Sequence, residues 1–241
     1  MTNNGGGSVT EFNSSGATLN TIQVGTRPRG ISIDASGNIW VANQGSNTVT
    51  KLSPTGTVLG TFAVGNGPYS LAVDSSGNVW VGNFRDDTVT KLSSTGTVLG
   101  AFTVGFAPRF VRIDPSGNVW VTIQGNDANP GTRVVELNAS SSVIGGVTVG
   151  VAPVSIRIDS AGNVFVSNGG TTAVPGTTVT EFSSSSKALI NTFTVGHNPG
   201  GMAIDSSGNL WVANYSDGTV TVLADVAKGP EYWPYTGPVW P

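Results

Sequence analysis

The sequence predicts an all-β propeller of four-stranded antiparallel blades, with six blades favoured and five as the alternative. The main observation is internal repetition, because one pattern of about 40 residues recurs five times and organises nearly the whole chain. Within each repeat, short apolar segments alternate with clusters of Gly, Pro, Asn and Asp, which is typical of strands joined by tight turns. An apolar content of 38% is enough for a substantial core.

Each repeat opens with Val-Gly-x-x-Pro, and the first expected strand follows the Pro. Six residues after that Pro, an Asp begins a turn of the form Asp-x-x-Gly-Asn, in which the Gly can adopt positive φ and the Asp can hydrogen-bond the turn backbone. The second strand is apolar at successive positions, the third alternates, and a small-residue turn leads to a fourth. Burial therefore decreases from inner to outer strands, as in a propeller blade. The turn residues are Asp34, Asp74, Asp114, Asp159 and Asp205.

The second strand of each repeat carries one large aromatic residue at an equivalent position. Because this strand is expected to be buried on both faces, we expect these side chains to fill the space between blades rather than to stack on a carbohydrate. They are Trp40, Trp80, Trp120, Phe165 and Trp211.

These residues form the pattern Gly-x-x-Pro-x-x-h-x-h-Asp-x-x-Gly-Asn-h-Trp-Val-x-Asn, where h is apolar. The pattern resembles the NHL-repeat and virginiamycin B lyase-like propellers over roughly residues 5–225. The resemblance implies the fold and, for a lyase, a His/Glu/His cluster that holds a divalent metal on one face. This chain has a single histidine, His197, so it cannot supply that cluster, and we expect no lyase activity.

The two ends of the chain decide how the propeller closes. Residues 2–12 resemble the end of a second strand, a loop and a third strand, so the chain enters in the middle of a blade. We expect one propeller domain over residues 1–228, closed by shared N- and C-terminal strands, and a Pro/aromatic tail over residues 229–241. The tail either folds back on its own chain, as a degenerate sixth blade, or joins a neighbour in a homo-oligomer. In the second case its aromatic side chains would pack on that neighbour: Tyr232, Trp233, Tyr235 and Trp240.

The composition excludes several classes of function. Charged residues make up only 10% of the chain, so Ser, Thr, Asn and Gly must cover the surface, which favours an extracellular or cell-envelope location with the signal peptide absent from this chain. A net charge of -3 offers no patch for nucleic acid, and no apolar run is long enough to span a membrane. We expect no cofactor and no metal, because the chain has no Cys, no P-loop, no Gly-x-Ser-x-Gly motif and no His pair.

Repeats three and four break the pattern, and we place the candidate site there. The spacing from the aromatic residue to the third strand is 14 residues instead of 9, which lengthens the loops at 124–133 and 168–178. Insertions on one face are a usual sign of a binding surface. These loops contain Gln124 and Asn168.

Two residues before the turn Asp, the same repeats have Arg112 and Arg157 where the others have Ser or Ala. A buried guanidinium needs an acceptor, which is either a backbone carbonyl, a turn Asp or a ligand. After the Pro, the first three repeats have Arg29, Tyr69 and Arg109. The candidate ligand-binding face therefore consists of seven residues: Arg29, Tyr69, Arg109, Arg112, Arg157, Gln124 and Asn168.

The sequence therefore predicts a non-catalytic interaction or structural module. Its partner would be a protein, a polar polymer or a small ligand. The alternatives are a lyase-like or carbohydrate-binding propeller with its ligand on the long-loop face, and a structural protein that self-assembles by sharing strands.

Overall fold

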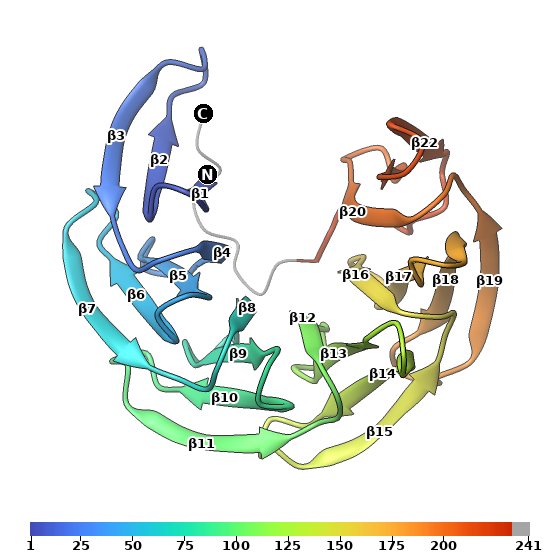
Figure 1. The fold of residues 1–241 in the computed structure, drawn as a ribbon, viewed down its shortest axis with the longest axis horizontal. Coiled ribbons are helices and arrows are strands. Elements are labelled where there is room, and N and C mark those ends of the chain that lie inside the picture. The colour runs from blue at the N-terminus through green and yellow to red at the C-terminus, as the bar shows by residue number, and fades with distance from the viewer. Residues whose placement is uncertain (233–241) are drawn as a thin grey trace. The chain divides into compact units, whose positions relative to one another are not determined.

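The structure is a computed structural model that describes residues 1–232, and all of its regular elements are β-strands (Figure 1). Six antiparallel sheets follow one another along the chain, and each contains consecutive strands in sequential order. Within the described part of the chain no helix is present that could cross a membrane. The described residues divide into two compact units, unit 1 over residues 1–103 and unit 2 over residues 104–232.

Unit 1 contains three sheets. The first is a three-stranded sheet of β1 (Thr2–Asn3), β2 (Ser8–Phe12) and β3 (Thr18–Gln23). The second contains β4 (Pro28–Ile33), β5 (Ile39–Asn43), β6 (Thr48–Leu52) and β7 (Val58–Ala63). The third contains β8 (Pro68–Val73), β9 (Val79–Asn83), β10 (Thr88–Leu92) and β11 (Val98–Thr103). The first strands of these sheets lie next to one another, since β1 contacts β4 and β4 contacts β8.

Unit 2 also contains three sheets. The first is β12 (Pro108–Ile113), β13 (Val119–Gly125), β14 (Pro130–Leu137) and β15 (Val143–Thr148). The second is β16 (Pro153–Ile158), β17 (Asn163–Gly170), β18 (Pro175–Ser183) and β19 (Leu189–Thr194). The third is β20 (Pro199–Ile204), β21 (Leu210–Asn214) and β22 (Thr219–Leu223). Here β16 contacts both β12 and β20, so the sheets stack through their first strands.

The N-terminal sheet confirms that the chain enters in the middle of a blade. The side-chain amide of Asn3 donates to the hydroxyls of Ser8 and Thr10, just as that of Asn43 donates to Thr48 and Thr50 at the end of a complete second strand. The predicted closure by shared strands is not seen in residues 1–232. No sheet there combines strands from both ends, because β2 pairs with the adjacent β3 and β22 pairs only with β21.

Each Asp-x-x-Gly-Asn turn is held by one carboxylate. In the first repeat, Asp34 Oδ1 accepts hydrogen bonds from the backbone N–H groups of Ser36 and Asn38 at 3.0 and 2.9 Å, while Oδ2 accepts the indole N–H of Trp40 at 3.0 Å. The turn therefore fixes both the hairpin and the orientation of the core aromatic residue. In the fifth repeat, the corresponding bonds from Trp211 and Asn209 lower the pKa of Asp205 to about 2.

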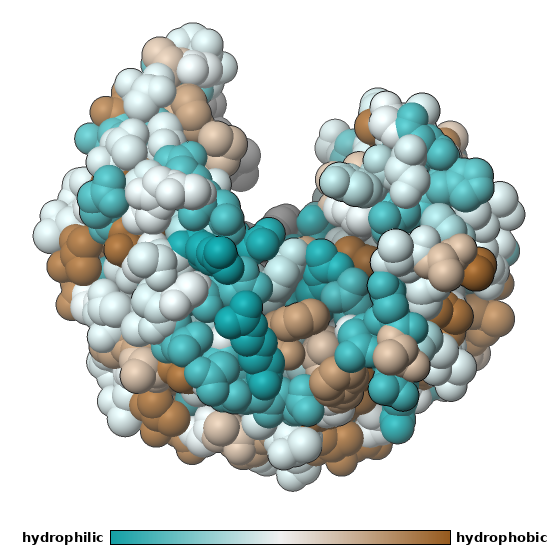
Figure 2. Space-filling model, viewed as in Figure 1, coloured by the Kyte–Doolittle hydropathy of each residue, from teal (hydrophilic) through white to brown (hydrophobic). Residues whose placement is uncertain are grey.

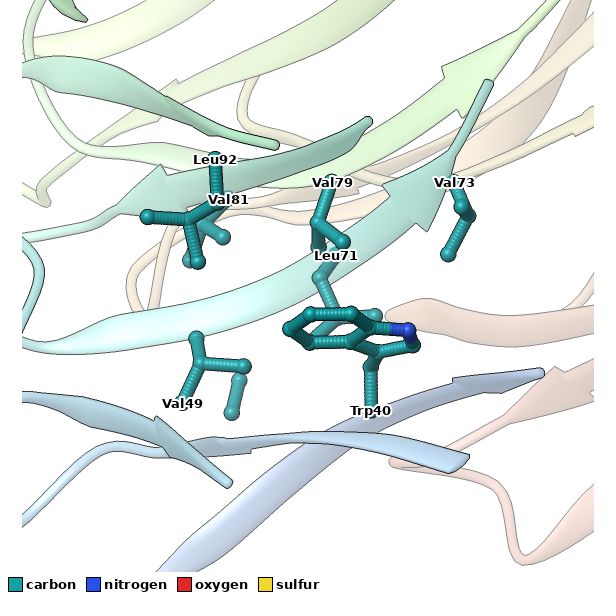
Figure 3. Packing of buried hydrophobic residues seen from close by; sticks show 8 residues of the cluster. Trp40, Val49, Leu71, Val73, Val79, Val81 and Leu92 are labelled. Carbon is teal, nitrogen blue, oxygen red and sulfur yellow. The ribbon is translucent and has the colours of Figure 1, made fainter. Parts of the chain in front are cut away.

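The aromatic residues on the second strands form the core between neighbouring sheets. Trp40 packs in a cluster with apolar residues of the next sheet, and Leu71 and Val79 lie beside its ring in Figure 3. The ammonium group of Lys51 lies 4.8 Å from the centre of the Trp40 ring, a cation–π contact that covers the outer side. Burial of this kind is the largest favourable contribution to blade-on-blade packing.

Four of the five predicted core aromatics are buried, and one is not. Trp40, Trp80, Trp120 and Phe165 are 0% exposed, whereas Trp211 is 44% exposed, which corrects the expectation that all five sites are equivalent. The reason is that Trp211 belongs to the last sheet of unit 2, and no following sheet of that unit covers it. Its local geometry is unchanged, since its indole still donates to Asp205 at 2.8 Å.

The surface is mostly polar, as the composition predicts. Some of the exposed apolar residues occur as pairs at the start of fourth strands, such as Val98 and Leu99 or Val143 and Ile144. In Figure 2 the brown residues lie as separate spots among white and teal ones. Scattered exposure of this kind is normal for a folded domain and does not by itself mark an interface.

We expect truncation of the equivalent tryptophans to have unequal effects. Trp40→Ala should lower the free energy of unfolding by about 3–5 kcal/mol because it empties a closed core, whereas Trp211→Ala should cost about 1–2 kcal/mol because half of the ring is already in water. Denaturant unfolding of the two variants measures the difference. Equal losses would contradict the sheet-stacking account.

Candidate anion-binding site

Arg112 and Arg157 occupy equivalent positions on neighbouring first strands of unit 2. Arg112 lies on β12 opposite Trp120, and Arg157 lies on β16 opposite Phe165. Their side chains are only 17% and 16% exposed. β12 and β16 contact each other (Figure 1), and both guanidinium groups lie within 4 Å of the Glu231 carboxylate.

Each arginine meets the acceptor requirement in two ways. One Nη1 atom donates to the backbone carbonyl of the preceding residue, Val111 or Ile156, at 2.9 Å in both cases. In addition, the Nε atoms of Arg157 and Arg112 lie 3.2 and 3.7 Å from Oε1 of Glu231. The predicted carbonyl partner is therefore present, and a carboxylate from the chain's own tail is shared between the two cations.

Burial dominates the electrostatics of this cluster. It lowers the pKa of Arg112 to about 10, and the nearby positive charge of Arg157 acts in the same direction. Burial also raises the pKa of Glu231, which the two arginines oppose. Two cations held together out of water need a shared anion, and Glu231 supplies it.

Both guanidinium groups hold the carboxylate of Glu231. Its Oε1 atom lies within ion-pair distance of the two Nε atoms, and the charges of both arginines together with a side-chain hydrogen bond from Arg112 oppose the effect of burial on its pKa.

The segment that carries Glu231 lies antiparallel to the end of β16. The N–H of Ser160 donates to the carbonyl of Pro230 at 3.0 Å, and the N–H of Tyr232 donates to the carbonyl of Ile158 at 2.7 Å. Asp159 and Glu231 form the bridge between these two bonds. Residues 228–232 are thus added to this strand end in the manner of a short extra strand.

Phe165 explains why the segment docks in this repeat. In the other four repeats the indole N–H of a tryptophan donates to Oδ2 of the turn Asp. Phe165 has no such donor, and the backbone N–H of Lys228 takes its place, donating to Asp159 Oδ2 at 2.7 Å. The substitution of Phe for Trp therefore leaves an acceptor that an incoming backbone satisfies.

Tyr232 closes the inner side of the site. It packs against the cluster that includes Trp120, Ile158 and Phe182. Burial and the charge of Asp114 raise the pKa of its phenol. Residues 228–232 lie against the fourth repeat of their own chain through one isolated bridge, and not as the predicted sixth blade, whereas Trp233, Tyr235 and Trp240 lie outside the described residues.

The long loops lie at the other end of these strands. The register pairs Pro108 with Ile123 at the loop end of β12 and Arg112 with Trp120 near the turn end, a separation of four residues or about 13 Å. The two loops contact each other, since Thr172 donates through its N–H and its hydroxyl to the carboxylate of Asp127. Arg112 and Arg157 therefore lie near one end of their strands and the long loops at the other, so the two parts of the predicted site are separate.

Arg109 and Gln124 remain at the loop end. Arg109 follows Pro108 on β12 and lies 6.0 Å from the centre of the Phe110 ring. The backbone N–H of Gln124 donates to the carbonyl of Ala107, which joins its loop to the Val-Gly-x-x-Pro loop as expected for a shared face.

The remaining predicted residues have other surroundings. Arg29 and Tyr69 contact each other in unit 1, with the guanidinium carbon 5.2 Å from the ring centre, and Arg29 also donates to Gln44 at 3.2 Å. Asn168 is buried, and its side-chain amide donates to Thr178 and Thr180, the same role that Asn43 has in the first repeat.

No grouping within residues 1–232 resembles a catalytic metal centre. His197 lies in an exposed loop, where its Nδ1 is 3.0 Å from Asp217. Glu136 is buried on β14 and pairs with Lys187 at 2.6 Å. No cluster of three or more His, Cys, Asp or Glu side chains that could hold a metal is found in this part of the chain.

Sequence reasoning identified both arginines but not their partner. Nothing in the repeat pattern points to Glu231. The available signal is the coincidence of three departures in adjacent repeats, Arg112, Arg157 and Phe165.

Comparisons with known proteins agree with this architecture. No family model matches the sequence, and no curated protein matches it. A streptogramin B lyase structure is similar with a TM-score of 0.81 and 16% identity, covering 98% of this chain and 78% of that one. The structure of a catalytically inactive virginiamycin B lyase from Staphylococcus aureus with quinupristin is similar with a TM-score of 0.78 and 13% identity, covering 95% of this chain and 78% of that one.

A functionally unknown protein from Desulfotomaculum acetoxidans DSM 771 gives a TM-score of 0.73 with 13% identity, covering 98% of this chain and 82% of that one. The fold is therefore that of a virginiamycin B lyase-like β-propeller. At these identities the similarity establishes the fold alone.

The charge cluster predicts a measurable coupling between Arg157 and Glu231. Arg157→Ala should lower the free energy of unfolding by about 1–3 kcal/mol, because it removes one of the two cations that compensate the buried Glu231 carboxylate. Combining it with Glu231→Gln should cost less than the sum of the single changes by about 1 kcal/mol. Urea unfolding of the four proteins gives the coupling energy. Arg133→Ala, at an exposed position on β14, is the control, and its effect should simply add to that of Glu231→Gln. If the effects of Arg157→Ala and Glu231→Gln also simply add, the assigned ion pair is wrong.

Proposed function

We propose that this chain is a non-catalytic interaction module whose unit 2 binds an anionic group of its partner through Arg112 and Arg157. The observation that carries the proposal is the convergence of two buried guanidinium groups, from equivalent positions of adjacent sheets, on one carboxylate that arrives on a separate segment. Planar guanidinium groups are well suited to carboxylates and other oxyanions.

The absence of a lyase cluster supports a role in binding rather than catalysis. The single histidine is paired with Asp217 in an exposed loop, and Glu136 is paired with Lys187 on a third strand. The low charge content and polar surface favour an extracellular or cell-envelope location, which we include in the proposal. Homo-oligomerisation through the N-terminal strands and the tail stays a prediction.

A lyase-like activity is the second candidate, and the similarity in fold to streptogramin B and virginiamycin B lyases favours it. The direct check is to incubate the full chain with quinupristin and a divalent metal and to follow loss of the intact compound by liquid chromatography with tandem mass spectrometry, because an elimination product can have the same mass as its substrate. We expect the substrate to remain intact. If the wild-type chain converts quinupristin and His197→Ala does not, the binding proposal is wrong and the chain is an enzyme.

The binding proposal predicts that a free dicarboxylate can replace the carboxylate of Glu231. In the full-length Glu231→Gln variant, glutarate should cause saturable shifts of the Arg112 and Arg157 Nε–H resonances in a proton–nitrogen NMR spectrum, because the two charges have lost their shared anion. The wild type should respond more weakly, since Glu231 competes.

Two controls make the titration specific. Glutaramide, which has the same skeleton without charge, should have no effect, and Arg157→Ala in the Glu231→Gln background should abolish saturation. Equal responses to glutarate and glutaramide would show that the arginines do not form an anion site.

A further inference from the structure

Unit 2 departs from its own repeat in three ways, and all three departures meet residues 228–232. Arg112 and Arg157 replace small residues and hold the carboxylate of Glu231. Phe165 replaces Trp and leaves the Asp159 carboxylate to accept the N–H of Lys228. Independent changes that converge on one segment indicate a site shaped to receive an extended chain.

Part of the contact does not depend on the sequence of the segment. The backbone groups of Ile158 and Ser160 pair with those of Tyr232 and Pro230, and the Ser160 hydroxyl donates to the carbonyl of Lys228 at 3.3 Å. Main-chain pairing of this kind gives affinity for any extended peptide, while side-chain pockets select among peptides.

The side-chain contacts define which peptide fits. A glutamate is needed between the two arginines, and an aromatic residue must follow it to cover the apolar cluster beneath Tyr232. Gly229 has a φ of 104°, and a Cβ there would lie 2.4 Å from the Ser160 hydroxyl, so glycine is required two residues before the glutamate.

A small oxyanion would satisfy only part of the site. Phosphate or acetate could neutralise the guanidinium groups but would leave the Ile158 carbonyl without its donor, Asp159 Oδ2 with one donor fewer and the apolar surface uncovered. Buried polar groups without partners are costly, which favours a peptide over a free anion.

We infer that this site receives an extended segment of a partner protein with the pattern Gly-x-Glu-aromatic, and that residues 228–232 are the occupant supplied by the chain itself. This inference rests on the proposed function and adds the class of ligand and its mode of binding. The Nε atoms of Arg157 and Arg112 lie 3.2 and 3.7 Å from Glu231 Oε1, longer than the roughly 2.7–2.9 Å of a tight charge-assisted hydrogen bond, so Glu231 is an occupant that a second glutamate can displace.

The test uses the full chain with its own anchors removed. In Glu231→Ala/Tyr232→Ala the tail keeps its length but loses both side chains that hold it. The probe is a fluorescein-labelled peptide of residues 226–232, Val-Ala-Lys-Gly-Pro-Glu-Tyr, whose binding is followed by fluorescence anisotropy. We expect saturable binding of the peptide to the double variant. Binding to the wild type should be weaker by about tenfold or more, because the chain's own tail competes.

Two controls identify the contacts. A peptide with Gln in place of Glu should bind about tenfold more weakly, and Arg157→Ala in the double-variant background should weaken binding similarly. Arg133→Ala in the same background should not change it. If the double variant does not fold, as judged by circular dichroism, the measurement is made on Glu231→Gln, which keeps the side-chain shape.

The outcomes separate this inference from the proposed function. If glutarate binds at the arginines but the peptide does not, the site is a simple anion site and the peptide inference is wrong. If neither binds, both fail. If the Glu and Gln peptides bind equally, the arginines do not select the ligand, and the inference is likewise overturned.

Discussion

The bond between the turn carboxylate and the core indole is the interaction on which the rest of the structure depends. One Asp side chain closes the hairpin through Oδ1 and orients the tryptophan through Oδ2, as in Asp114 with Trp120 at 2.9 Å. Local turn formation and packing between sheets are therefore coupled in each repeat. Because the partner sites are only six residues apart, this coupling needs no long-range contact to form.

The fourth repeat shows what happens when this bond is interrupted. Phe165 fills the same buried position as the tryptophans, but Asp159 Oδ2 receives only the Asn163 amide from its own hairpin and lacks the second donor that an indole supplies in the other repeats. A distant segment supplies the donor and brings Glu231 to the two arginines. The site thus arises where one repeat lacks a hydrogen-bond donor that the others have. Another part of the chain supplies that donor, and a partner protein could supply it in the same way.

The sequence predicted the strands, the turns and four of the five buried aromatic residues because each depends on neighbours within one repeat. It did not predict the exposure of Trp211, which depends on whether another sheet follows in its unit. It identified Arg112 and Arg157 as unusual but could not identify Glu231, because that pairing joins residues more than 70 positions apart in sequence and follows no repeat. The register also separated these arginines from the long loops, which spacing alone had grouped together.

Restoring the missing donor tests the central claim most directly. Phe165→Trp should place an indole N–H at Asp159 Oδ2 and displace Lys228, and loss of that bond should weaken docking by about 1.5 kcal/mol. Hydrogen exchange should then be about tenfold faster at the amides of Lys228 and Tyr232, while the amides of Met202 and Leu210 in the adjacent core stay as protected as before. Unchanged protection at Lys228 and Tyr232 in a folded variant would contradict the account.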